Sequence, residues 1–401
     1  MTTAVAAGGV TTPLGFKAAG VSAGIKVNGG SDLALVVSET AATAAAVFTT
    51  NRAQAAPVVV SREHIERAGG LARAIVVNSG CANACTGDEG VSVAQEMTAE
   101  TARLLGCSAE QVLVASTGVI GVALPIDKIR SGLPAALRAL AVDQGSAAAR
   151  AIMTTDPFPK EASARATIAG REIVVGGMAK GSGMIEPMMA TMLAFVTTDA
   201  SVPRLLLDRA LRDVVNDTFN AITVDGECST NDCVFLLANG ASGVQIDDGS
   251  YAPFVAALRT VCRELALGIV RGGEGATKLV AVTVTGAATA DQARKAAKAI
   301  ANSPLVKTAI HGGDPNWGRL IAVAGRAGVA FELNRASVAI GPTVLFKDGQ
   351  PYDENAPRAA EYLSGKEIAV TVHLGVGSEE STVWTCDLSA EYVRINADYR
   401  T

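Results

Sequence analysis

Short runs rich in valine and isoleucine alternate along this chain with longer stretches whose apolar residues recur at helical spacing. The runs at 33–38, 73–78 and 111–117 are typical of buried β-strands, because β-branched side chains favour strands. The stretches at 202–216 and 251–270 are typical of amphipathic helices. This alternation predicts a mixed α/β (α+β) protein whose strands and helices pack in layers.

The C-terminal part of the chain differs from the rest in having shorter and more strand-rich elements. The strands expected there, around one surface helix at 291–301, are 278–285, 319–324, 366–374 and 381–388. Because the change begins near residue 285, we expect a larger domain over residues 1–285 and a smaller α/β domain over residues 286–401.

Charge and aromatic content limit the classes of partner. The formal net charge is -5, and aromatic residues make up 4% of the chain. Because there is no run of Lys or Arg and few rings for base stacking, we expect no nucleic acid partner. The start of the chain lacks the basic and apolar regions of a secretory signal. The longest apolar stretches carry charges and are too short to span a membrane, so we expect no membrane partner.

The seven cysteines are odd in number and scattered, so they predict neither a disulfide framework nor a paired CxxC zinc site. A histidine-rich metal site is not expected either, because there are three histidines. These counts predict a soluble protein of a reducing cytoplasm. The cysteines are Cys81, Cys85, Cys107, Cys228, Cys233, Cys262 and Cys386, and the histidines are His64, His311 and His373.

The segment KGSGMIEPMMA at 180–190 is unusual for a loop, because apolar residues precede a threonine that opens an apolar strand. Its glycines allow strained backbone angles, and Pro187 stiffens the approach. Strain beside a hydroxyl group is what an autoproteolytic N-to-O acyl shift requires. The Thr191 hydroxyl would attack the Ala190 carbonyl, and the resulting ester would hydrolyse.

Such a cut would leave Thr191 with a free α-amine. An amine of this kind has a pKa of about 8, so it can deprotonate the hydroxyl of its own residue. Taken alone, a threonine at the start of a strand is more often structural than catalytic. The rest of the chain changes that balance.

Several long segments occur in a fixed order along the chain. They are GVTTPLGFKAAGVSAGIK (9–26), NSGCANACTG (78–87), STGVIG (116–121), MTTDPFPK (153–160), KGSGMIEPMMATMLAF (180–195), DTFNAITVDGECSTND (217–232), GGEGATK (272–278), HGGDPNWGR (311–319) and RINADYRT (394–401). In these segments the chain resembles, from end to end, the ornithine acetyltransferases of arginine biosynthesis, also called glutamate N-acetyltransferases. This ordered set is far more specific than any single motif.

The resemblance implies a fold and a processing event. The fold is an αββα layered sandwich shared with self-cleaving amidases and distinct from the Ntn-hydrolase fold, followed by a smaller α/β part that closes the site. The cut falls between Ala190 and Thr191, which gives an α-chain of 1–190 and a β-chain from 191. The family's mature form pairs these two chains, and two pairs associate into an α2β2 heterotetramer.

Catalytic roles follow from the same resemblance. Thr191 matches the nucleophile, and Thr117 with Gly118 matches the oxyanion hole. A hydroxyl and a backbone N–H at a strand end suit that task, since an oxyanion needs donors aimed where charge develops. Read without the family, a Thr-Gly pair after a strand is an ordinary turn.

Substrate-binding roles fall on residues spread along the chain. Lys180 matches a lysine that pairs with a substrate carboxylate, and Thr154 matches another substrate contact. Glu274 matches an acidic residue that binds the ornithine amine or assists proton transfer, and its flanking glycines favour close approach to a ligand. Asn396 and Thr401 match substrate contacts, so the C-terminal tail is expected to be held in place. The structural alternatives are a surface lysine, a turn residue, a loop carboxylate and a frayed end.

No direct catalytic role is assigned to the run HGGDPNWGR. His311 is not read as a general base, because Thr191 supplies its own. We expect a packed turn that supports the site, with Trp317 as its anchor. Cys81 stands where many relatives carry Asn, so no specific role is carried over to it, and the cysteines are read as small buried residues.

The implied reaction is a ping-pong acetyl transfer through an acetyl-Thr191 ester. N-acetylornithine donates the acetyl group and leaves as ornithine, and glutamate accepts it to become N-acetylglutamate. No metal or other cofactor is needed. Some members of the family also accept acetyl-CoA, and nothing in this sequence separates them from strict recyclers.

Two other functions compete with this one. An aminopeptidase or amidase on the same self-cleaving scaffold would release its acyl group to water, so turnover without glutamate distinguishes it. A non-catalytic amino-acid-binding protein on this scaffold would lack the nucleophile or the oxyanion donors, and Thr191, Thr117 and Gly118 are all present.

Overall fold

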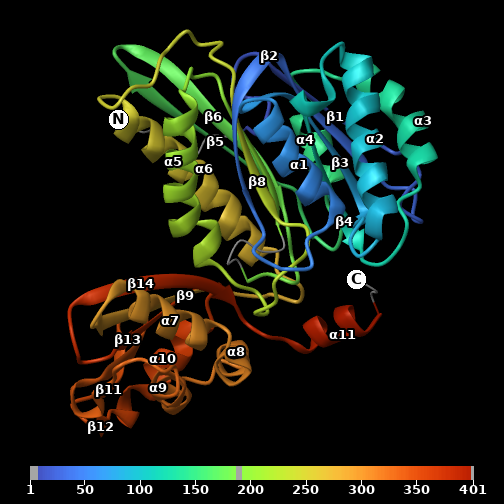
Figure 1. Cartoon of the computed structure of the whole chain (residues 1–401). Helices are drawn as coiled ribbons and strands as arrows, with labels where there is room; N and C mark the ends of the chain where they lie inside the picture. The colour runs from blue at the N-terminus through green and yellow to red at the C-terminus, as the bar shows by residue number, and fades with distance from the viewer. Residues whose placement is uncertain (1–7, 187–191, 399–401) are drawn as a thin grey trace. The chain divides into compact units, whose positions relative to one another are not determined.

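A computed structural model describes residues 8–186 and 192–398 of the chain (Figure 1). The chain forms two compact units. The first unit comprises the described residues up to Asn220 together with Glu227–Ile269, and the second comprises Ala221–Gly226 and the described residues from Val270 onward. The domain boundary expected near residue 285 falls inside strand β9 (Leu279–Ala287), and that strand belongs to the sheet of the second unit.

The first unit is built on one eight-stranded sheet. Its strands follow the order β4-β3-β2-β8-β7-β6-β5, and β1 also pairs with β2. The bounds are β1 (Phe16–Val21), β2 (Leu33–Phe48), β3 (Leu71–Cys81), β4 (Val112–Val119), β5 (Lys160–Ile168), β6 (Arg171–Lys180), β7 (Leu193–Thr198) and β8 (Cys233–Ala238).

The long strand β2 joins two layers of this sheet. Its first half pairs with β1 and β3, its second half pairs with β8, and its pairing with β3 shifts register between Val37 and Ala42. A shift of this kind bends a strand. The inner core therefore collects side chains from both layers, including Val36 and Ile75 from one and Phe195 and Phe235 from the other.

Alternation along β2 shows why the run at 33–37 is continuously apolar. Leu33 and Leu35 pack with the helices on the outer face, whereas Ala34 and Val36 enter the inner core. Successive side chains of a strand point to opposite faces, so a strand buried on both faces needs apolar residues at every position.

Helices cover the outer face of each layer in the first unit (Figure 1). On the β3–β4 side, side chains of α1, α2 and α3 form one core with the strands. On the other side, α5 packs on β2, and Gly177 of β6 lies against Val261 and Leu265 of α6. The expected αββα layered sandwich is confirmed. The helices are α1 (Ala56–Arg67), α2 (Gly87–Leu105), α3 (Ile126–Arg138), α4 (Gly145–Ala151), α5 (Arg204–Asp217) and α6 (Tyr251–Arg271).

The second unit has a six-stranded sheet in the order β12-β11-β10-β13-β9-β14. Alternate valines of β9, such as Val280, Val282 and Val284, share its core with Ala296 and Ile300 of α7. The remaining elements are α7 (Ala290–Ala301), α8 (Pro304–His311), α9 (Trp317–Gly325), β10 (Ser337–Ile340), β11 (Thr343–Lys347), β12 (Gln350–Pro351), α10 (Ala356–Leu363), β13 (Glu367–His373), β14 (Glu379–Cys386) and α11 (Ala390–Asp398).

The strand expected at 319–324 is wrong, because α9 occupies it. The Asn316 side chain accepts a hydrogen bond from the Arg319 N–H and caps the helix, and Leu320, Val323 and Ala324 form its buried face. A short apolar run has no period of its own that separates helix from strand. In the described part of the chain, no helix is long and apolar enough to cross a membrane.

Candidate functional site

Lys180 lies at the end of β6 and is almost fully buried, with 4% of its surface exposed. Its ammonium group donates hydrogen bonds to the Thr154 hydroxyl at 2.9 Å and to the Thr117 hydroxyl at 3.2 Å. The structure therefore brings together three residues that the sequence analysis selected from three distant segments. Neither hydroxyl carries a charge, so these two contacts do not neutralise a lysine ammonium. A buried lysine in such contacts suits an anionic ligand.

Gly118 follows Thr117 near the end of β4, where β4 runs beside the end of β3. Its φ is +129°, and a Cβ at this position would lie 2.4 Å from the carbonyl carbon of Gly80. Glycine is required here both by the backbone angle and by the close approach of the two strands. This contact holds the strand end that carries both predicted oxyanion donors.

Asp156, for which no role was predicted, joins the two predicted substrate contacts Thr154 and Lys180. One carboxylate oxygen accepts from the Lys160 ammonium at 2.5 Å and from the Gly181 N–H at 2.7 Å. The other accepts from the Thr154 N–H at 3.0 Å. The same buried carboxylate thus holds the backbone of Thr154 and the residue directly after Lys180. Side chains four positions apart meet on a helix, but this segment is not helical, so the spacing of Asp156 and Lys160 did not indicate their contact.

The charges around Asp156 explain its ionisation. Burial alone would raise the pKa of Asp156, but the charges of Lys180 and Lys160 and the Gly181 N–H outweigh burial and lower it to about 2. Burial lowers the pKa of Lys160, and Asp156 opposes that effect. Burial also lowers the pKa of Lys26. The charge of Asp156 opposes this effect, and the charge of Lys180 adds to it.

Three lysines and two aspartates lie close to one another among the described residues of this region. They are Lys26, Lys160, Lys180, Asp32 and Asp156. Asp32 also accepts three backbone hydrogen bonds, from Ala23, Ile25 and Lys26. A surplus of positive charge in a buried place attracts an anion such as a carboxylate.

Two buried amide side chains form hydrogen bonds with the backbone at the ends of β3 and β4. The Asn231 amide donates to the carbonyl of Ala82 at 2.6 Å and to that of Ser116 at 2.9 Å. Asn78 donates to the Cys81 carbonyl and accepts from the Ser116 hydroxyl at 2.6 Å. These contacts tie the backbone directly before Thr117 to two other segments. Asn78 and Asn231 lie in the motifs NSGCANACTG and DTFNAITVDGECSTND, but no role was predicted for them.

Cys81 behaves as a small buried residue in this arrangement. Its thiol donates to the Val122 carbonyl at 3.2 Å, and burial raises its pKa. A protonated thiol in such a place is a poor nucleophile. The interpretation of Cys81 as a packing residue therefore fits its surroundings.

The second unit brings together Glu274 and Asn396. The Asn396 amide donates to the Glu274 carboxylate at 2.8 Å, and 7% of Glu274 is exposed. Asn396 lies in α11, so this part of the C-terminal tail is held in place as expected. The glycines beside Glu274 have a different reason from the one expected: Gly273 lies against the Cys386 sulfur, and Gly275 against the backbone N of Tyr392. A Cβ at either glycine would therefore press on another part of the chain.

Three predicted site residues, Ala190, Thr191 and Thr401, lie outside the described residues. The chain next to Thr191 is described: Met192 is buried, and its carbonyl accepts the Cys233 N–H at 3.2 Å. Leu193 then pairs with Lys180 across β6 and β7. The polypeptide thus enters the sheet directly opposite Lys180.

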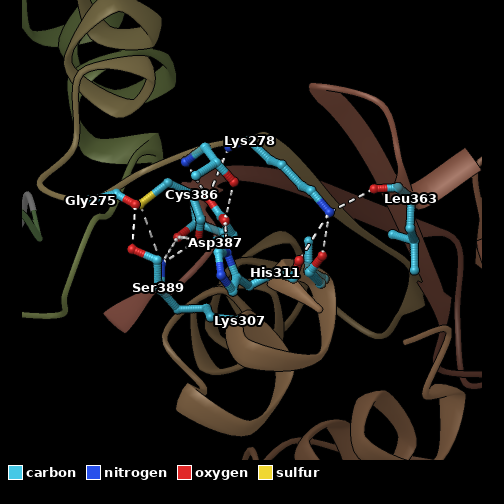
Figure 2. A network of polar contacts seen from close by, with 11 residues as sticks. Gly275, Lys278, Lys307, His311, Leu363, Cys386, Asp387 and Ser389 are labelled. Atoms are coloured by element: carbon cyan, nitrogen blue, oxygen red, sulfur yellow. Dashed lines mark hydrogen bonds and ion pairs between the residues drawn. The ribbon is translucent and has the colours of Figure 1, made fainter. Parts of the chain in front are cut away.

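The run HGGDPNWGR forms the end of α8, a turn and the start of α9. Trp317 stacks on Phe346 with ring centroids 4.9 Å apart, as expected of an anchor residue. His311 forms a 2.6 Å contact with Asp387, in the network that Figure 2 shows. Among residues 8–186 and 192–398, no group of three or more His, Cys, Asp or Glu side chains is placed to hold a metal ion.

Comparisons with known proteins agree over nearly the whole chain. The ArgJ family model matches residues 17–401. The chain is 50% identical to the arginine biosynthesis bifunctional protein ArgJ of Symbiobacterium thermophilum over 400 residues, covering 98% of this chain and 99% of that protein.

Two solved structures each match about half of the chain. A crystal structure of the arginine biosynthesis bifunctional protein argJ from Bacillus halodurans is 44% identical with a TM-score of 0.51, and covers 52% of this chain and 100% of its own. A crystal structure of an ornithine acetyltransferase from Mycobacterium tuberculosis, complexed with ornithine, is 40% identical with a TM-score of 0.44, and covers 48% of this chain and 100% of its own.

Proposed function

The chain belongs to the ArgJ family, acyltransferases of arginine biosynthesis, and from this premise we propose that it moves the acetyl group of N-acetylornithine to glutamate through an ester on Thr191. The observation that carries the proposal is the contact of Lys180 with Thr117 and Thr154, directly opposite Leu193. A cation, a hydroxyl donor and the chain that follows the nucleophile meet at one sheet end.

The first step is self-cleavage of the precursor. The Thr191 hydroxyl attacks the Ala190 carbonyl, the peptide C–N bond breaks, and Thr191 gains a free α-amine while Ala190 is held as an ester. Water then hydrolyses the ester and leaves the Ala190 carboxylate. The Bacillus halodurans structure supports this step, because that whole chain corresponds to 52% of the present one. Residues 191–401 are likewise slightly more than half of the chain.

Acetyl transfer then proceeds in two halves. The Thr191 amine takes the hydroxyl proton as the oxygen attacks the acetyl carbonyl of N-acetylornithine. It returns that proton to the leaving nitrogen as the C–N bond breaks and ornithine departs. The Thr117 hydroxyl and the Gly118 N–H stabilise the oxyanion. The amine of glutamate next attacks the Thr191 ester, so that N-acetylglutamate forms and the Thr191 hydroxyl is restored.

Substrate recognition follows from charge. Lys180, supported by the cationic surplus around Asp156, binds the α-carboxylate that both amino acids share. Glu274, with Asn396, binds the substrate amine or takes part in proton transfer, and Thr154 and Thr401 complete the contacts. No cofactor enters these steps. We further propose that acetyl-CoA serves as a second donor, since the relatives are described as bifunctional.

A denaturing gel with N-terminal sequencing tests the cleavage. We expect two bands of similar mass, of which the second begins Thr-Met-Leu-Ala. Thr191→Ala removes the hydroxyl and abolishes both the cut and the transfer, whereas Thr191→Ser keeps a hydroxyl and retains both. A single uncut band from fully active enzyme would contradict the mechanism.

Dependence on the acceptor separates the proposal from the amidase alternative. Steady release of ornithine from N-acetylornithine should require glutamate, because the acetyl-enzyme needs an amine to discharge it. Continuous release in buffer alone would favour an amidase. A rate with acetyl-CoA and glutamate in place of N-acetylornithine tests the second donor.

Assembly and compartment extend the proposal. We expect two αβ pairs per molecule, which native mass measurement reports. All seven cysteines are free of disulfides in the structure, which supports a reducing cytoplasm as the compartment.

A further inference from the structure

Asp387, directly after β14, accepts hydrogen bonds at both of its carboxylate oxygens (Figure 2). One oxygen accepts the backbone N–H of Thr277 at 2.7 Å and of Lys278 at 2.9 Å. The other accepts the Thr277 hydroxyl at 2.5 Å and His311 Nδ1 at 2.6 Å. Burial alone would raise the pKa of Asp387, but the hydrogen bonds from Thr277, His311 and Lys278 outweigh burial and lower it. Asp387 thus clamps the end of the loop at 272–278 as an anion.

Helix α8 holds this clamp from the other side. The Lys307 ammonium, buried in the second unit, donates to the Thr385 hydroxyl at 2.8 Å and to the Cys386 carbonyl at 2.5 Å. Lys278 in turn donates to the carbonyls of Ile310 at 2.6 Å and Leu363 at 2.7 Å (Figure 2). These carbonyls lie at the C-terminal ends of α8 and α10, where a cation is favoured. Loop, strand end and helix end are therefore locked together.

The same loop carries Glu274. The Ser389 hydroxyl donates to the Gly275 carbonyl at 2.7 Å, and Gly275 has a φ of +69°. Three residues separate Glu274 from Lys278, and both ends of that short span are bound to the segment 387–389. The backbone directly after Glu274 is therefore held by contacts that include the His311–Asp387 hydrogen bond.

We propose that His311 and Asp387 are positioning residues, which hold the loop at 272–278 so that the Glu274 carboxylate keeps one orientation toward the substrate amine. The proposal rests on the role of Glu274 under the proposed function. His311 supplies a donor to Asp387 and exchanges no proton with substrate. This assigns a task to the run HGGDPNWGR.

A pair of substitutions at His311 tests the donor. His311→Asn places an amide N–H close to the position of Nδ1, whereas His311→Ala leaves Asp387 without this donor. We expect His311→Ala to lower kcat/KM for N-acetylornithine by about 10-fold or more, because a small displacement of a positioned group lowers the rate strongly. His311→Asn should restore most of that loss. Equal losses in both variants would overturn the proposal, and so would a retained wild-type rate in His311→Ala.

A double-mutant cycle tests whether the effect passes through Glu274. Thr277→Val removes one hydrogen bond of the clamp while keeping the shape of the side chain, and it serves if Asp387→Ala does not fold. Either change should lower kcat/KM in the parent enzyme. In an enzyme that already carries Glu274→Gln, the same change should alter kcat/KM by no more than about 2-fold. If the fold-losses of the two single variants multiplied in the double variant, the proposal would be overturned.

A matched control and a separate readout complete the test. Thr382→Val removes the hydrogen bond between Thr382 of β14 and Thr283, away from the loop, and should leave kcat/KM unchanged. All of these variants should still cut themselves, since cleavage is assigned to Thr191. If Thr191→Ala retained activity, the proposed function would fail; if only the cycle were additive, the positioning role alone would fail.

Discussion

At the scale of single residues, Asp156 is the most consequential side chain that was not expected. The side chains of Asp156 and Lys160 are 0% and 1% exposed, and their ion pair lies beside a second buried lysine, Lys180. Removing one partner of a buried pair is more damaging than losing a surface pair, because the other charge stays buried without compensation. The site therefore depends on Asp156 for its electrostatic balance as well as for its hydrogen bonds.

Asp156→Asn should lower the free energy of unfolding by about 3–5 kcal/mol, measured by urea unfolding. Asp156→Asn combined with Lys160→Met removes both charges and should recover part of the loss. Glu39→Gln breaks the exposed pair with Lys17 and should leave the unfolding midpoint unchanged. An Asp156→Asn midpoint equal to that of Glu39→Gln would show that the pair is not structural.

The pKa of Asp156, about 2, predicts how its contribution to the free energy of unfolding changes with pH. The pKa of an aspartate in an unfolded chain is about 3.9. Because the folded pKa is the lower one, the stabilisation is complete above the unfolded pKa and is lost as the pH falls through about 2. The difference in unfolding midpoint between wild type and Asp156→Asn should thus be constant near neutral pH and shrink below about pH 4. A difference independent of pH down to 2.5 would contradict this.

At the scale of elements, the loop at 272–278 and helix α11 depend on one another. Gly275 permits the contact, since a Cβ there would lie 2.5 Å from the Tyr392 N and 2.8 Å from the Ser389 hydroxyl oxygen. The Tyr392 hydroxyl adds a 3.2 Å hydrogen bond to Asp225 within the same unit. A short C-terminal helix is held here by contacts with a loop rather than by burial of its own, since none of its described residues is buried.

Gly275→Ala should therefore release α11 as well as strain the loop. We expect faster hydrogen exchange over 390–398 and a fall in kcat/KM of about 10-fold or more. Gly313→Ala is a matched control, because Gly313 has the same φ of +69° but nothing within 4 Å of an added Cβ. That control should add backbone strain of about 1 kcal/mol and leave exchange in α11 unchanged. Equal exchange in the two variants would contradict the role assigned to Gly275.

At the scale of the whole molecule, the proposed cut falls between two neighbouring strands of one sheet. Strand β6 precedes it and β7 follows it, and the two pair antiparallel from Val175–Thr198 to Lys180–Leu193. Strand β8 pairs with β2, which also joins the two halves of the chain. The inner core mixes Phe195 and Phe235 from one half with Phe16 and Ile75 from the other. Cleavage would leave this shared sheet and core intact.

The two cleaved chains should consequently stay together in native buffer. A tag on the N-terminal chain should retain the C-terminal chain through extensive washing, and both should appear on a denaturing gel of the eluate. Only a denaturant that unfolds the shared core should separate them. Loss of the C-terminal chain during a native wash would show that the sheet does not hold the halves together.

The sequence by itself determined most of the local elements and the family of the chain. Short runs rich in valine and isoleucine predicted buried strands, and β2, β3 and β4 occupy them. Ordered motifs selected Thr117, Thr154 and Lys180, and the ArgJ match confirms the family that they indicated. These features depend on neighbours in sequence, so they can be read without a fold.

Only the tertiary structure decided how these residues meet. Lys180 and Thr117 are 63 positions apart, and Asp387 and Thr277 are 110 apart. The bend of β2 that joins the two layers was also decided by pairing with distant strands. Local periodicity encodes which face of an element is apolar, but not which partner covers that face. Asp156 and Asp387 could not be assigned from sequence for the same reason: the groups that make each carboxylate important are brought to it by the fold.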